Sequence, residues 1–62
     1  MTKKQLETLL AGAILQRDRA QKMIREHFDD LEKNNKNAYW TNIYLTNKAL
    51  AEWVRKQKPD DE

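Results

Sequence analysis

The apolar positions of this chain recur every three or four residues in two stretches, and a short polar segment separates them. The first stretch begins at Thr2 and the second at about Ala38. A spacing of three and four residues places apolar side chains along one side of an α-helix. The pattern therefore predicts an all-α protein, with a long helix at about residues 3–33 and a shorter helix at about 38–57.

Local signals mark the ends of both predicted helices. Thr2 followed by Gln5 has the form of a capping box, in which the threonine oxygen accepts a backbone N–H at the start of a helix. The turn at 34–37 contains three asparagines, which tolerate the left-handed conformation. The last of them, Asn37, is placed to cap the second helix. Pro59 ends that helix, because the residue before a proline is pushed out of the α region.

The longer predicted helix carries the most apolar segment of the chain. At about 1.5 Å per residue the two helices extend ~46 Å and ~30 Å, so an antiparallel hairpin leaves about 11 residues of the first helix unpartnered. Burying a large apolar side chain contributes about 1.5–3 kcal/mol, so these residues require a covering surface. We expect two copies, or a larger closed set, to associate, with the dimer forming a four-helix arrangement. The expected oligomer interface consists of Leu6, Leu9, Leu10, Ala13 and Ile14.

Gly12 offers a second arrangement for the first helix. A glycine in a helix interior costs up to ~1 kcal/mol against alanine, so a hinge at Gly12 would divide the helix and give three helices. No turn residues accompany it, and oppositely charged pairs at four-residue spacing continue beyond it, such as Arg25 with Asp29. These pairs favour one continuous helix.

Antiparallel pairing through the asparagine turn predicts which side chains meet. Phe28 falls near Ile43, and Asn47 falls beside a polar layer of Gln21 and Arg17. A buried polar residue in a helical seam commonly fixes register, which is the role we assign to Asn47.

The second helix carries a further apolar stripe a quarter turn or more away from that seam. Its residues follow at four-residue spacing and include a tryptophan, a residue type enriched at interface hot spots. We expect it either to extend the bundle core or to bind a partner protein. The candidate partner-binding residues are Leu45, Ala49 and Trp53.

The amino-acid composition limits the kinds of site and reaction that we expect of this protein. The 62 residues include no cysteine and a single histidine, His27, so neither a disulfide nor a zinc centre has enough ligands. No nucleophile–base pair or Gly-rich phosphate loop is present, and we expect no enzyme activity, cofactor or metal. The longest apolar run, 9–15, is far shorter than the ~20 residues that cross a bilayer, which predicts a soluble, cytoplasmic protein. The domain is expected to span 1–58, with an acidic, disordered tail at 59–62.

Charge suggests an alternative function. The formal net charge is +2, and one nine-residue window holds four cations that a dimer would duplicate into a stripe for nucleic acid. These cations are Arg17, Arg19, Lys22 and Arg25. Acidic residues among them weaken that field, so the leading hypothesis is a small regulator or inhibitor that occupies a protein surface. Abundant lysine and asparagine are typical of A-rich coding sequences and indicate a bacterial or phage origin.

Overall fold

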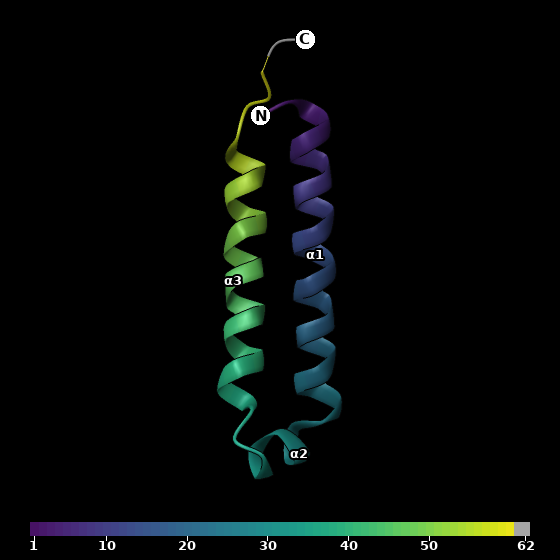
Figure 1. The fold of residues 1–62 in the computed structure, drawn as a ribbon, viewed down its shortest axis with the longest axis vertical. Coiled ribbons are helices and arrows are strands. Elements are labelled where there is room, and N and C mark those ends of the chain that lie inside the picture. Colours follow the sequence, from purple (N-terminus) through teal and green to yellow (C-terminus); the bar gives the residue numbers. More distant parts are fainter. Residues whose placement is uncertain (61–62) are drawn as a thin grey trace.

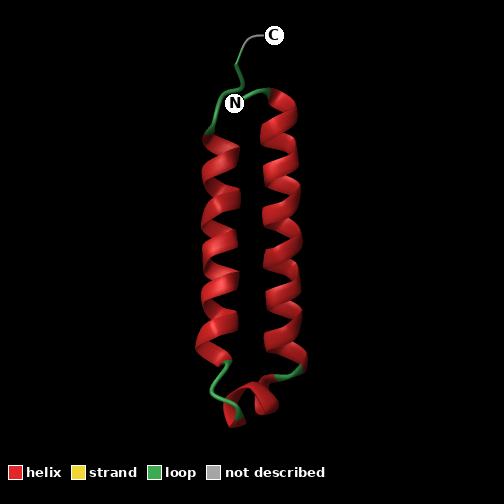
Figure 2. Cartoon of the chain, in the orientation of Figure 1, coloured by secondary structure: helices red, strands yellow, loops and turns green. Residues whose placement is uncertain are grey.

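A computed structural model describes residues 1–60 of the chain. Three helices follow one another, α1 (Lys3–Glu26), α2 (Phe28–Lys33) and α3 (Asn37–Lys56), and no described residue lies in a strand. The long helices α1 and α3 run antiparallel and side by side, and α2 connects them at one end (Figures 1 and 2). The all-α class and the antiparallel hairpin are therefore confirmed.

The start of α1 has the predicted capping box. The Thr2 hydroxyl accepts a hydrogen bond from the Gln5 amide at 3.1 Å, and the Gln5 side chain accepts one from the Thr2 amide at 2.9 Å. Gly12 lies within α1, which continues unbroken through it. The hinge considered at that position is therefore absent.

The continuous helix expected over 3–33 is wrong, because it breaks at His27. This residue ends α1 and precedes α2 with φ −125° and ψ 29°, outside helical values. Arg25 lies in the last turn of α1, and Asp29 and Asp30 lie in the first turn of α2. A cation at a helix C-terminus and carboxylates at a helix N-terminus both oppose the helix dipole, so the charges favour a boundary here.

The turn after α2 is built by the predicted asparagines. Asn35 adopts a left-handed φ of 55°. The Asn35 amide donates to the Glu32 carbonyl at 3.2 Å, and the Lys36 amide donates to the Leu31 carbonyl at 2.8 Å. This pair of bonds is a Schellman motif, which satisfies carbonyls left free at a helix end.

The limits of α3 differ by one residue from those expected. Lys36 stands at the N-cap and Asn37 is the first helical residue, so the capping role assigned to Asn37 is wrong. At the other end Gln57 is extended, with ψ 142°. The chain then runs to Asp60, which contacts the N-terminus of the protein. Residues 61 and 62, the remainder of the predicted tail, lie outside the described residues.

The predicted overhang of α1 does not occur. With α2 folded off its end, α1 has 24 residues against 20 in α3, a difference of about 6 Å at 1.5 Å per residue. The leucine-rich start of α1 lies alongside the C-terminal half of α3 (Figure 1). The expected register also shifts, and Phe28 lies 49% exposed rather than packed in the core.

The core of the hairpin is thin. Its buried apolar residues form a single seam between α1 and α3, closed by one leucine from α2, and half of them are alanines. They are Leu6, Ala13, Ala20, Leu31, Ala51 and Val54. The Cα radius of gyration is 14.4 Å, against about 11 Å for a compact chain of this length. The molecule is one layer of two helices, and its large side chains lie beside the seam rather than in it.

Candidate interaction surfaces

One side of the hairpin, here named the Trp40 face, is apolar along its centre, with charged residues of both signs at its rim. Met23 of α1 and Trp40 of α3 line the same hollow, which fixes the side on which both lie. Residues seven apart on a helix point nearly the same way, and residues three apart share a side, which places the other members of the face. The Trp40 face consists of Leu9, Gln16, Met23, Trp40, Ile43 and Leu50. All except Gln16 are half-buried apolar residues.

The opposite side, the Tyr44 face, mixes apolar residues with cations. Ile24, Gln21 and Arg25 of α1 line a hollow with Tyr44 of α3. The same spacing rules extend this face along both helices. It consists of Leu10, Ile14, Arg17, Gln21, Ile24, Arg25, Tyr44, Lys48 and Arg55. The two faces thus share a seam and differ in charge.

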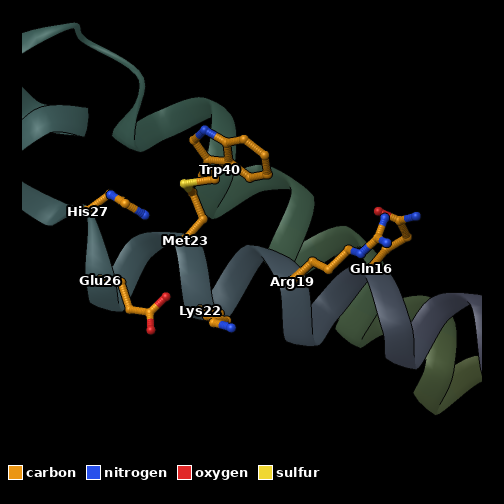
Figure 3. A pocket seen from close by; sticks show the side chains of 7 residues that line it. All are labelled: Gln16, Arg19, Lys22, Met23, Glu26, His27 and Trp40. Carbon is orange, nitrogen blue, oxygen red and sulfur yellow. The ribbon is translucent and has the colours of Figure 1, made fainter.

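The hollow on the Trp40 face measures about 390 Å³. In Figure 3 the Met23 side chain lies against the Trp40 ring, while Lys22 and Glu26 point away from it. The charged groups at its edge carry both signs. An apolar side chain from another molecule suits this hollow, because its polar groups lie at the rim and its centre is a thioether and an indole.

A metal ion requires several ligating side chains held close together. No three His, Cys, Asp or Glu side chains among residues 1–60 gather closely enough to hold a metal ion. His27 lies at the break between α1 and α2 and lines the edge of the Trp40-face hollow. Interaction surfaces are therefore the features on which a functional argument can be built.

The residues predicted as an oligomer interface do not share one surface. Leu6 and Ala13 are buried in the seam of their own chain, at 8% and 2% exposure. Leu9 belongs to the Trp40 face, whereas Leu10 and Ile14 belong to the Tyr44 face. The sequence pattern identified these residues as apolar. In the structure α3 packs on the middle of the apolar side of α1, which leaves Leu9 on one side of the seam and Leu10 and Ile14 on the other.

The predicted stripe on the shorter helix is present and points away from α1. Leu45 is 51% exposed and Trp53 is 48% exposed, and Ala49 between them is also exposed. Their four-residue spacing sets them along one outer edge of α3. About half of the Leu45 and Trp53 surface is therefore open to water.

The four cations proposed for nucleic acid are divided between surfaces. Arg17 contacts Asp18 at 3.0 Å, and Arg25 lies on the same Tyr44 face. Arg19 and Lys22 line the hollow on the opposite face. They do not form one stripe within a single chain.

Asn47, which we expect to fix the register between the helices, makes its side-chain hydrogen bond within its own helix. Its amide nitrogen donates to the Ile43 carbonyl of the same helix at 2.8 Å, which satisfies it locally. The sequence reading missed Lys48 and Arg55, which join the cations of α1 on the Tyr44 face. Their seven-residue separation was the available signal, since it sets both on one line of α3.

Among residues 1–60, none of the helical segments has the length and hydrophobicity that spanning a lipid bilayer requires. Comparison with known proteins finds no matching family model, no similar curated sequence and no similar solved structure. Functional proposals therefore rest on the surfaces of the chain itself.

Proposed function

We propose that this protein is a non-enzymatic homodimer that acts by protein–protein interaction, as a small regulator or inhibitor. The observation that carries the proposal is the incompleteness of its core. Half of the buried residues are alanines, while two tryptophans, two tyrosines and the phenylalanine are half-buried or exposed. Aromatic side chains usually supply much of a core, so their position outside it favours association.

Surface area gives the size of the missing contact. The chain exposes 5031 Å², whereas a compact monomer of 7.4 kDa exposes about 4,200 Å². The excess of about 800 Å² equals the area that each partner contributes to a standard protein–protein interface. One contact of ordinary size would therefore bring the protein to the exposure of a compact domain.

The exposed stripe of Leu45, Ala49 and Trp53 is the surface we assign to the partner that the dimer regulates. It lies on the outer edge of α3, so a dimer formed through either face beside the seam leaves Ala49 at its centre accessible, while Trp53, three residues from Leu50, borders the Trp40 face. A half-exposed tryptophan flanked by leucine and alanine has the composition of an interface anchor.

Sedimentation tests the homodimer. We expect a dimer at micromolar concentration and a thermal midpoint that rises with protein concentration, because association and folding are linked. A monomer at high concentration, with unchanged melting on dilution, contradicts the proposal.

Substitution of Trp53 tests the partner surface. We expect Trp53→Ala to abolish capture of partner proteins from a host lysate while helix content and oligomer size stay unchanged. Tyr39→Ala is the matched control, since Tyr39 is an exposed aromatic residue of the same helix outside the stripe. If Trp53→Ala also loses helix content and dissociates, the stripe belongs to the structural core.

A second candidate function is nucleic-acid binding through the Tyr44 face. The structure adds Lys48 and Arg55 to Arg17 and Arg25 on that face, which gives a longer run of cations than the sequence pattern suggested. Retention on heparin or duplex DNA that falls steeply with salt favours this function. Absence of retention at moderate salt favours the protein partner.

A further inference from the structure

We infer that the second copy packs on the Trp40 face, so that the two hairpins form a four-helix bundle with their Tyr44 faces outward. This inference rests on the proposed homodimer and names the surface through which it forms. It replaces an interface centred on the start of α1 with one that runs along both long helices.

Charge distinguishes the two faces. A two-fold dimer places the same patch of each copy against the other, so any charge on that patch meets its own duplicate. The Tyr44 face carries Arg17, Arg25, Lys48 and Arg55, and its self-association would bring these cations together as they leave water. The charged residues of the Trp40 face, Arg19, Lys22 and Glu26, lie at the rim of its hollow and carry both signs, so self-association there brings fewer like charges together than on the Tyr44 face.

Shape favours the same face. Trp40 and Met23 line a hollow of about 390 Å³ beside the seam, and in Figure 3 the Met23 side chain points toward the Trp40 ring. Ile43 and Leu50 continue the apolar surface along α3, and each is half-buried within its own chain. Half-buried side chains of this kind become fully buried when a second layer covers them. A second copy supplies that layer, and the area required is the excess of about 800 Å² per chain derived above.

Adjacent residues on α1 provide a matched pair of variants. Met23 lies on the Trp40 face and Ile24 on the Tyr44 face, and both are half-buried apolar residues. Met23→Lys places a charge at the proposed interface of each copy, and we expect the dissociation constant to rise by at least roughly 100-fold. Ile24→Lys should leave the dissociation constant within about threefold of the parent, because it adds a cation to an outward face. Circular dichroism confirms that both variants keep their helix content.

A second measurement applies even if a lysine variant fails to fold. Gln16 and Gln21 are exposed glutamines of α1 on the Trp40 and Tyr44 faces, and the chain has no native cysteine. Nitroxide labels on Gln16→Cys and Gln21→Cys report distances between the two copies by electron–electron dipolar coupling. Gln16 lies near the middle of α1, so its two labels are close whether the hairpins pair parallel or antiparallel. We expect a shorter distance between Gln16 labels than between Gln21 labels.

The outcomes separate this inference from the homodimer itself. A shorter distance between Gln21 labels, or dissociation by Ile24→Lys and not by Met23→Lys, overturns the Trp40 face while leaving a dimer. Equal dissociation by both lysine variants overturns it as well, because neither face is then preferred. A parent protein that stays monomeric at every concentration refutes the homodimer on which the inference rests.

Discussion

The two ends of the hairpin are closed by different means. At the connected end, α2 places a buried leucine, Leu31, against the long helices, and the Schellman motif at Asn35 fixes the chain that returns to α3. At the open end, the terminal amine of Met1 contacts the Asp60 carboxylate at 2.9 Å, in a pair that is largely exposed to water. The first end is closed by a buried leucine and the hydrogen bonds of a turn. Beyond Leu6 and Val54, the second is closed by an exposed charge pair and by one backbone hydrogen bond, from the Asp60 amide to the Met1 carbonyl.

This difference sets an order of stability along the molecule. Burial of a leucine contributes about 1.5–3 kcal/mol, whereas exposed ion pairs contribute about 0–1 kcal/mol. We therefore expect the connected end to open only when the whole hairpin unfolds, and the open end to exchange amide hydrogens sooner.

Leu31→Ala is expected to have the largest effect. Leu31 is 6% exposed, and removing a buried leucine side chain costs about 2–5 kcal/mol of unfolding free energy. Chemical denaturation at fixed protein concentration measures the loss. Phe28→Ala, in the same short helix, is the control, and we expect it to cost less because Phe28 is 49% exposed. A greater loss for Phe28→Ala would show that α2 packs through its other side.

Substitutions of Asn35 are expected to have the next largest effect on the free energy of unfolding, and whether they stabilise or destabilise depends on the residue introduced. Because its φ is 55°, we expect Asn35→Val to cost about 1–2 kcal/mol and Asn35→Gly to stabilise by up to ~1 kcal/mol. Asn34→Val is the comparison, and we expect a smaller loss because Asn34 has an ordinary φ of −98° and gives up only the hydrogen bond that its side chain donates to the Asp30 carbonyl at 2.8 Å. Thermal melting of the three variants at one concentration checks the prediction. Equal losses for Asn34→Val and Asn35→Val would contradict the Schellman motif.

Thr2→Ala tests the open end through its capping box. Removing the hydroxyl that accepts the Gln5 amide is expected to cost about 1 kcal/mol. Hydrogen exchange should quicken in the first turn of α1 and stay unchanged in α2. Thr8→Ala is the control, because Thr8 is exposed within α1 and alanine is the better helix former. If Thr2→Ala slows folding but leaves amide hydrogen exchange equally slow in the first turn of α1 and in α2, the open end does not open locally.

The sequence predicted local features at both ends of the hairpin. The capping box was found because Thr2 and Gln5 are three residues apart and act locally. The asparagine turn was found for the same reason, and Asn35 adopts the expected left-handed conformation. Signals confined to a few neighbouring residues can be read without knowing what packs against them.

The break at His27 was missed because its charges support two interpretations. Arg25 and Asp29 are spaced as a pair on one continuous helix, and equally as a C-terminal cation and an N-terminal carboxylate of two helices. Packing of Leu31 against α1 and α3 decides between them, and local spacing does not contain that contact. The predicted overhang depended on an unbroken helix, and the expected interface at the start of α1 was inferred from that overhang.

The candidate surfaces were predicted in part. The stripe of Leu45, Ala49 and Trp53 follows from helical spacing alone and is exposed as a line on α3. The Trp40 and Tyr44 faces combine residues from two helices, so their membership depends on the register between α1 and α3. That register changes when six residues enter α2, and spacing within one helix cannot supply it.

Asp60→Asn is expected to have the smallest effect. The substitution removes the carboxylate charge that faces the Met1 amine, but it keeps the backbone bond in which the Asp60 amide donates to the Met1 carbonyl at 2.9 Å. Since the Asp60 side chain is 70% exposed, water and salt screen the pair, and we expect the midpoint of denaturation to stay within error of the parent. Glu52→Gln, an exposed carboxylate within α3, is the control for a change of net charge. A loss for Asp60→Asn as large as that for Leu31→Ala would mean that the ion pair holds the two termini together, and the two ends would then be equally strong.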